Sequence, residues 1–216
     1  MAFHASRPVL LTGFWSALAI VLVGILYIVV LFAGGVTRGV PREPFFAWAE
    51  ILTIVAAALM VCLMAAIHLW TPSERRIFSM LALGWMLAAA AITTTVHGAE
   101  LTVGRQMDAE SRRAFALIFD FEWPSLLFAI EFVAWHIGIG LATFFAAFTF
   151  ENSGPEKIIR QGLLASGLLC LAGWVGPATG NMTLRLIGVF GYAVVLPIIC
   201  VPIALLFRRA EQRHKL

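Results

Sequence analysis

Residues 123–150 read WPSLLFAIEFVAWHIGIGLATFFAAFTF, and Glu131 is the only Asp, Glu, Lys or Arg in this run. A helix needs roughly 20 apolar residues to cross a bilayer, so the run is long enough to do so. A charge placed in hydrocarbon costs about 2.5–3.5 kcal/mol on insertion scales, and it is usually kept where it has a partner or a function. The run therefore predicts a membrane span in which Glu131 is the first residue to consider for function.

Five more runs contain no Asp, Glu, Lys or Arg: 8–37, 51–73, 77–99, 161–184 and 186–207. The chain is 61% hydrophobic and 12% charged, whereas soluble domains are about 45–50% apolar and about 25% charged. We expect an all-α polytopic membrane protein, a bundle of six transmembrane helices that forms one domain over 1–216. The predicted spans are about 11–33, 46–70, 77–97, 124–149, 158–175 and 183–207, with the fourth beginning near Pro124. The first is too long for a cleavable signal peptide and should stay as an anchor.

The basic residues favour one orientation of these spans. If the N-terminus is cytoplasmic, nine Lys and Arg residues lie inside and six lie outside. The sequence thus predicts a multi-pass protein of a bacterial inner membrane with both termini cytoplasmic. Basic flanks of this kind also account for the net charge of +3, so no nucleic-acid partner is implied.

The one long connection, between the third and fourth spans, predicts a short outer helix at about 109–119 that lies on the membrane surface. Asp108 is placed to cap its N-terminus. The spacing of Asp108 with Arg112 and of Glu110 with Arg113 predicts surface ion pairs.

Polar residues collect near the predicted outer ends of several spans. Steps of three and four place Thr93, Thr94, His97 and Glu100 on one helix face. Glu131 lies about 10 Å into the fourth span. Arg185 and, seven residues on, Tyr192 share a face of the last span, while Asn181 and Glu50 also lie on the outer side. The sequence therefore predicts a polar cluster in the outer half of the bundle.

Each residue type in this cluster suits a chemical role. Glu131 is the candidate catalytic acid or base, and His97 its relay. Arg185 is expected to hold an anion or to pair with Glu131, and Tyr192 to donate a hydrogen bond. Glu100, Thr94 and Asn181 complete the predicted ligand-binding set. The alternative is that these groups only hold helices together.

Cofactors are not expected. His68, His97 and His136 fall at three different depths, which argues against a haem held by two histidines. A metal site formed by His97, Glu100 and Glu131 is an alternative, but His-x-x-Glu alone is a weak signal, because zinc or iron sites need three or four convergent ligands. Cys62, Cys170 and Cys200 lie in apolar runs without metal or redox spacing. His136 is expected to be a core histidine bonded to a neighbouring helix.

Two parts of the chain, Val96–Val103 and Leu171–Pro177 continuing to Ile187–Tyr192, resemble a group of uncharacterised six-span bacterial integral membrane proteins. The resemblance implies the fold but no activity.

Three functions remain open from the sequence. The leading hypothesis is binding of a small amphipathic or lipid-like molecule in the outer polar pocket, with acid–base chemistry on it as one form. The others are proton-coupled transport through Glu131 and His136, and a non-catalytic subunit of a membrane complex. Expected partners are membrane lipids and the small ligand, with a homo-oligomer or a complex partner as further options.

Overall fold

The computed structural model describes residues 5–35 and 41–213, and the regular elements within them are all helices. The α-helices are α1 (Arg7–Gly34), α2 (Phe45–Trp70), α3 (Arg76–Ala99), α4 (Ala109–Ala114), α5 (Ala116–Phe119), α6 (Leu126–Phe132), α7 (Ile139–Ala147), α8 (Gly154–Gly173), α9 (Val175–Thr179), α10 (Arg185–Phe190) and α11 (Leu196–Arg213). The other elements are a 3₁₀ turn, η1 (Ser73–Arg75), and three π-helical segments, η2 (Glu100–Gly104), η3 (Val133–Gly138) and η4 (Gly191–Val195).

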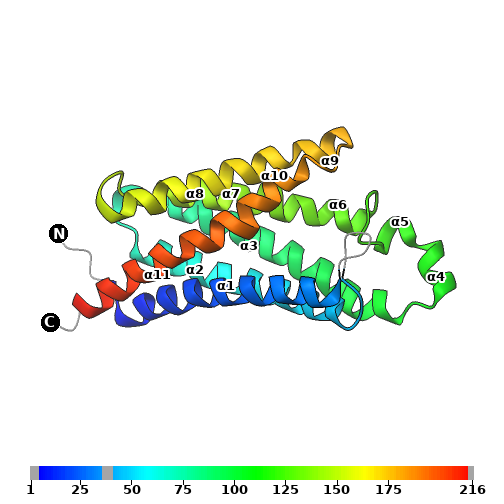
Figure 1. The fold of residues 1–216 in the computed structure, drawn as a ribbon. Coiled ribbons are helices and arrows are strands. Elements are labelled where there is room, and N and C mark those ends of the chain that lie inside the picture. The colour runs from blue at the N-terminus through cyan, green and yellow to red at the C-terminus, as the bar shows by residue number, and fades with distance from the viewer. Residues whose placement is uncertain (1–4, 36–40, 214–216) are drawn as a thin grey trace.

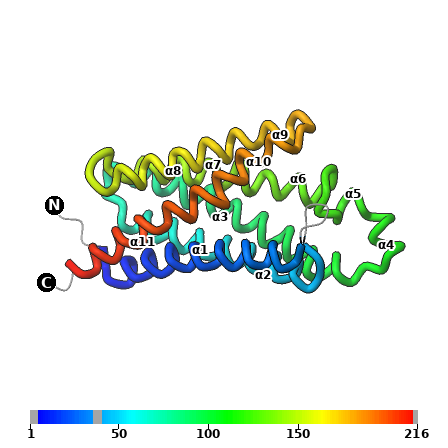
Figure 2. Tube along the Cα trace, in the orientation of Figure 1, coloured from blue at the N-terminus to red at the C-terminus, as the bar shows by residue number. Residues whose placement is uncertain are grey.

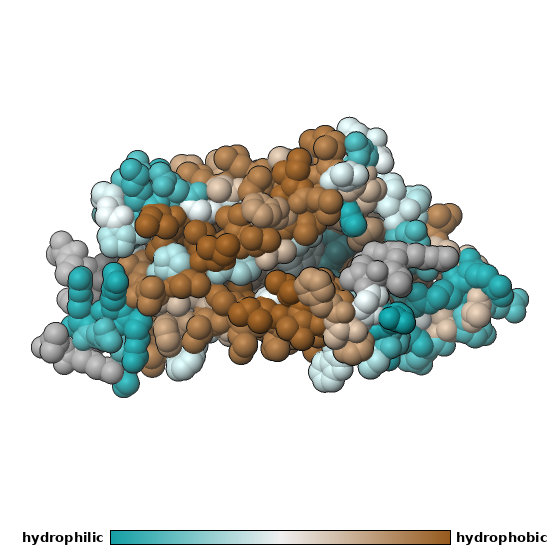
Figure 3. All heavy atoms as spheres, viewed as in Figure 1, coloured by the Kyte–Doolittle hydropathy of each residue, from teal (hydrophilic) through white to brown (hydrophobic). Residues whose placement is uncertain are grey.

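Six continuous helical stretches of the described chain are long and apolar enough to cross a membrane: Arg7–Gly34, Phe45–Trp70, Ser73–Gly104, Leu126–Ala147, Gly154–Thr179 and Arg185–Arg213. The prediction of an all-α bundle with six spans is confirmed. Side chains on the visible face form a broad apolar belt between two hydrophilic ends (Figure 3). Helices suit such a belt because each satisfies its own backbone hydrogen bonds where no water is available.

The spans form a closed ring in chain order. Each packs against the next: α1 against α2, α2 against α3, α3 against α7, α7 against α8 and α8 against α11. The ring closes where α11 returns to α1. The start of α1 and the end of α11 lie at one end, called here the terminal end, and α4, α5 and α9 lie at the opposite loop end (Figures 1 and 2).

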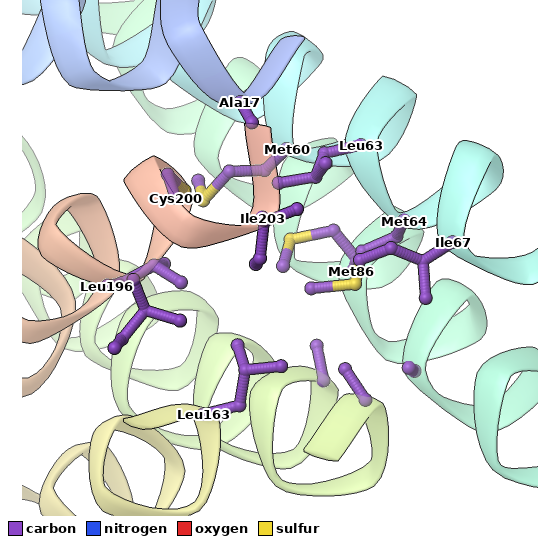
Figure 4. Packing of buried hydrophobic residues seen from close by; sticks show 14 of the residues in the cluster. Ala17, Met60, Leu63, Met64, Ile67, Met86, Leu163, Leu196, Cys200 and Ile203 are labelled. Carbon is purple, nitrogen blue, oxygen red and sulfur yellow. The ribbon is translucent and has the colours of Figure 1, made fainter. Parts of the chain in front are cut away.

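The terminal-end half of the ring is filled by apolar side chains. Leu63 and Ile67 of α2, Met86 of α3, Leu163 of α8 and Ile203 of α11 are all buried and belong to one cluster. Side chains from these four helices point toward one another across the centre of the ring (Figure 4). These side chains form an apolar core at the centre of this half.

Small residues allow the helices to approach closely. A Cβ atom on Gly167 of α8 would lie 2.8 Å from the carbonyl oxygen of Gly140 and 2.8 Å from the amide nitrogen of Phe144. Only a hydrogen fits there, so α7 and α8 meet backbone to backbone.

The fourth span begins two residues later than predicted. Ser125, rather than Pro124, precedes its first turn, and the Ser125 hydroxyl accepts a hydrogen bond from the backbone N–H of Phe128. Serine satisfies an otherwise unpaired amide at this position, which proline cannot do.

The predicted outer helix is present as two short pieces, α4 and α5, which project beyond the other helices at the loop end (Figure 1). Asp108 caps α4 as predicted, because its carboxylate accepts a hydrogen bond from the Ser111 amide at 2.7 Å. This bond lowers the pKa of Asp108 from its usual value. The predicted Asp108–Arg112 pair is wrong, since Arg112 reaches Glu100 and Asp120 instead. No ion pair joins Glu110 to Arg113 in the described chain.

Candidate acid–base site

Three helices meet at a buried chain of two carboxylates and one imidazole, called here the Glu–His–Glu bridge: Glu50 of α2, His97 of α3 and Glu131 of α6. His97 Nδ1 lies 2.6 Å from Glu50 Oε2, and His97 Nε2 lies 2.8 Å from Glu131 Oε1. The three residues are 3%, 5% and 7% exposed, respectively. Both contacts are short and excluded from bulk solvent, so the three groups form one electrostatic unit.

The bridge can hold its protons in more than one arrangement. An imidazolium donates from both ring nitrogens, and two carboxylates then accept. A neutral imidazole donates from one nitrogen only, so the other contact then needs a protonated carboxyl that donates to the ring. A proton can pass along the bridge from one carboxyl group to the other without any helix moving.

Glu131 is held in place by two further donors. Trp135, one turn along the same helical span, donates from Nε1 to Glu131 Oε1. Thr93 of α3 lies 3.5 Å from the same oxygen through its hydroxyl. The second oxygen, Glu131 Oε2, is buried and has no hydrogen-bond partner within the described residues. One carboxylate oxygen is thus fixed by three contacts, and the other is buried without one among the described residues.

The bridge carries uncompensated negative charge when its three groups are ionised, because two carboxylates face one imidazolium. No Lys or Arg of the described residues lies within ion-pair distance of Glu50 or Glu131. Isolated buried charge is expensive. In that state the bridge presents a net negative charge that no described basic side chain neutralises.

A cavity of about 600 Å³ opens at the loop end beside the bridge. Its lining is partly aromatic and strongly charged: Glu43, Phe46, Glu100, Gly104, Arg105, Met107, Arg112, Asp120, Phe121 and Glu122. The ring of Phe121 is 5.5 Å from the His97 ring, centre to centre. Phe121 thus lines the cavity and also contacts the bridge.

Glu100 lies on the cavity wall, one turn beyond His97. It is 1% exposed, and its Oε1 accepts a hydrogen bond from Arg112 of α4 at 2.7 Å. Arg112 also donates to the carbonyl oxygen of Gly104 at 2.9 Å. The loop helix is therefore fastened to the end of the third span through this ion pair.

Arg185 does not pair with Glu131, which corrects the predicted ion pair. Its guanidinium lies over the rings of Phe128 and Phe132, at 5.3 and 5.8 Å from their centres. Glu131 faces α2 and α3 instead, where His97 supplies a closer partner. A sequence gives the depth of each residue but not the rotation of one helix about its axis relative to another.

Three other predicted residues lie apart from the bridge. Thr94 is exposed, because it is 100° around α3 from Thr93, which faces Glu131. Asn181 is exposed and accepts a hydrogen bond from the Thr183 amide in the turn before α10. Tyr192 is half-buried with its ring centre 4.8 Å from that of Trp135, so it touches the bridge only through a neighbour.

His136 belongs to helix packing rather than to the bridge. Its ring is buried, and Nε2 donates to the carbonyl oxygen of Arg185 at 3.3 Å. A Cβ atom on Gly173 or Gly188 would lie about 2.5 Å from the ring. The expected core histidine, bonded to a neighbouring helix, is confirmed.

Metal binding is not suggested by the described side chains, among which no group of three or more His, Cys, Asp or Glu residues converges on one point. In the bridge itself the two carboxylates bind opposite edges of the imidazole, so their oxygens do not share a centre.

Two residues at the bridge, Glu50 and Trp135, were not assigned a role from the sequence. Glu50 was placed at the right end of the bundle but was given no role, although an ionisable group five residues into a span is itself a signal. Trp135 stands four residues after Glu131, the spacing at which helical side chains meet.

We compared the chain with protein-family models, curated proteins and solved structures, and none of them matches it. The resemblance to six-span bacterial membrane proteins stays a prediction, and the function is argued from the site alone.

Proposed function

We propose that this protein binds a small amphipathic or lipid-like molecule at the loop end of its bundle and exchanges a proton with it through the Glu–His–Glu bridge. The observation that carries the proposal is the bridge itself, buried in the bundle and adjoining a cavity. At about 600 Å³ the cavity falls in the usual range of ligand pockets, roughly 300–1,000 Å³.

The proposed chemistry begins at Glu131. Its unpartnered oxygen takes a proton from the polar group of the ligand or gives one to it. His97 passes a proton between Glu131 and Glu50, because its two ring nitrogens contact the two carboxylates. Phe121 lines the cavity and contacts the His97 ring, so it joins the ligand pocket to the bridge. Trp135 and Thr93 hold Glu131 in position throughout.

The amphipathic character of the ligand follows from the surroundings. Charged side chains and the rings of Phe46 and Phe121 line the cavity together, and an apolar belt separates the two hydrophilic ends of the molecule (Figure 3). A polar head group suits the cavity wall, and an apolar tail suits the belt.

Proton-coupled transport through Glu131 and His136 has weaker support. His136 is enclosed by glycine backbone and bonds to a main-chain carbonyl. The terminal-end half of the ring is apolar across its centre. Both features favour a site reached from one end over a path that crosses the bundle.

We also propose that the loop end faces outward from a bacterial inner membrane, with both termini cytoplasmic. The Lys and Arg count supports this orientation. A cysteine placed at Ser111 should react with an impermeant maleimide added outside, and one placed at Ser73 should not. The opposite labelling pattern would reverse the orientation.

The binding proposal is tested on protein purified from its native membrane. Small molecules are extracted from the wild type, Glu131→Gln, His97→Gln and the control His68→Gln, and are measured by mass spectrometry. His68 bonds to Ser79 near the terminal end and is the matched histidine outside the site. We expect one amphipathic species to be enriched on the wild type and the control and depleted on both bridge variants.

Equal retention on all four proteins at matched folding yield would place the ligand elsewhere. If the wild type retains no such species, binding at the loop end is refuted.

A further inference from the structure

The charges around the loop-end cavity are unbalanced. Four carboxylates line it, against two guanidinium groups. Arg105 lies 3.7 Å from Glu43, and Arg112 is shared between Glu100 and Asp120. Glu122 makes no ion pair in the described chain. Both arginines of the cavity wall thus already pair with carboxylates, and the wall keeps an excess of negative charge.

One of these carboxylates is buried and only half satisfied. Glu100 Oε1 is bonded to Arg112, but Glu100 Oε2 has no hydrogen-bond partner among the described atoms. A Cβ atom on Gly104 would lie 2.3 Å from Oε2, so this buried oxygen is packed closely against Gly104, where only a glycine leaves room for it. Both residues line the cavity. An unpaired buried acceptor costs about 1–3 kcal/mol, more when charged, which a bound donor or cation would offset.

The second source of negative charge is the Glu–His–Glu bridge. Phe121 contacts its His97 ring, no guanidinium or ammonium group of the described residues pairs with it, and its Glu131 Oε2 has no hydrogen-bond partner among the described atoms. One unsatisfied carboxylate oxygen thus belongs to the cavity wall, and a second belongs to the bridge that Phe121 contacts.

The aromatic lining of the cavity also favours a cation. Phe46 and Phe121 both line the cavity, with their ring centres 5.9 Å apart. The face of an aromatic ring attracts a cation within about 6 Å, and it offers nothing comparable to an anion.

We infer that the head group of the ligand is cationic, an amine or a quaternary ammonium, seated between Glu100 and the rings of Phe46 and Phe121. This inference rests on the proposed function and specifies the charge of its ligand. An ammonium group with a proton on nitrogen would be the donor in the exchange with the bridge, whereas a quaternary group would bind without exchange.

The test uses three probes with the same twelve-carbon tail: dodecyltrimethylammonium, dodecyl phosphate and dodecyl maltoside. Binding to the full chain in lipid nanodiscs is measured by displacement of a tritiated dodecyltrimethylammonium tracer. We expect saturable binding of the cation, and at least roughly tenfold weaker displacement by the other two, the effect of losing one charged contact. Glu100→Gln should weaken binding of the cation by about tenfold, and Glu122→Gln by about threefold, because Glu122 is exposed.

The matched control is Glu110→Gln, which removes an exposed carboxylate from the same end of the molecule but not from the cavity wall. Its affinity should equal that of the wild type. Since Glu100→Gln leaves Arg112 without its closest partner, the double variant Glu100→Gln with Arg112→Gln is measured alongside it. Glu122→Gln tests the inference even if both of these fail to fold.

Each other outcome overturns the inference in a distinguishable way. Saturable binding of dodecyl phosphate, weakened by Arg112→Gln, would give an anionic head group and leave the proposed binding function standing. Cation binding that no carboxylate variant alters would mean partition into lipid only. If no probe binds the wild type saturably, the cationic head group is refuted, and the retention experiment decides the binding function separately.

Discussion

The terminal-end and loop-end halves of the ring are made by the same six spans, but they satisfy buried polar groups in different ways. Toward the terminal end, Thr71 and Thr143 donate to carbonyl oxygens of their own helices. The groups that bond between helices there do so in pairs or at the surface, as in His68 with Ser79 and Arg7 with Glu211. At the loop end, Glu50, His97 and Glu131 bond to one another across three helices. Bonds within a helix can form in any helix, whereas the bridge exists only when α2, α3 and α6 are packed together. The comparison indicates that the first half carries the packing and the second the chemistry.

The largest effect is expected from removing the centre of the bridge. His97→Leu leaves two buried carboxylates facing each other, and it should lower the free energy of unfolding by about 4 kcal/mol. Replacing Glu50, His97 and Glu131 together by Leu should restore most of that loss, because no buried charge then remains. Unfolding by a denaturing detergent measures both. A His97→Leu protein as stable as the wild type would show that the bridge is not a buried electrostatic unit.

The apolar half should respond in stability alone. Leu163 is fully buried in the core shown in Figure 4, and Leu163→Ala should cost about 3 kcal/mol through the cavity it leaves. Ligand retention per folded molecule should stay at the wild-type level. A loss of retention that matches that of Glu131→Gln would remove the functional distinction between the two halves.

Much of this division follows from the sequence, because hydrocarbon restricts the options. Spans must be helical and about 20 residues long, so composition alone sets their number and approximate limits. The same logic places His97 and Glu131 in the outer half of the bundle. Helix rotation is not encoded so directly, and for that reason Arg185 was paired with the wrong group and Thr94 was assigned to the wrong face.

Competition between local partners explains another error. Asp108 and Arg112 have the spacing of an ion pair, but the carboxylate is used to cap α4. Arg112 is then free to reach Glu100, which needs a partner more because it is buried. Spacing identifies the pairs that can form, whereas burial decides which of them do.

A smaller effect on stability is expected from the close helix packing around His136. A Cβ atom on Gly173 would lie 2.5 Å from the Gly188 amide nitrogen and 2.6 Å from the His136 ring, so Gly173→Ala should destabilise the protein by about 2 kcal/mol. Gly84 lies in a helix with nothing within 4 Å, and Gly84→Ala should be neutral or stabilise by up to about 1 kcal/mol. Thermal unfolding measures both variants. Equal responses would contradict the close approach of α8 to α10.

The smallest effect concerns the exposed loop helix α4. The pKa of Asp108 is lower in the folded protein because the Ser111 amide donates to it. Its capping contribution is therefore complete above the unfolded pKa of about 3.9 and is lost as the pH falls through the folded value. Hydrogen-exchange protection of Ser111 should fall over that acidic range in the wild type but not in Asp108→Asn, whose amide oxygen still accepts. Protection independent of pH in both proteins would contradict the cap.

The most direct test of the account is infrared difference spectroscopy on wild-type protein, stripped of its small molecule and then given it back. If the bridge exchanges a proton with the ligand, binding should change the carbonyl band of a protonated carboxylic acid. That change should disappear in Glu131→Gln and persist in the cavity-forming variant Leu163→Ala. A wild-type spectrum without any carboxyl change, or the same change in Glu131→Gln, would contradict the claim that the loop-end half performs the chemistry.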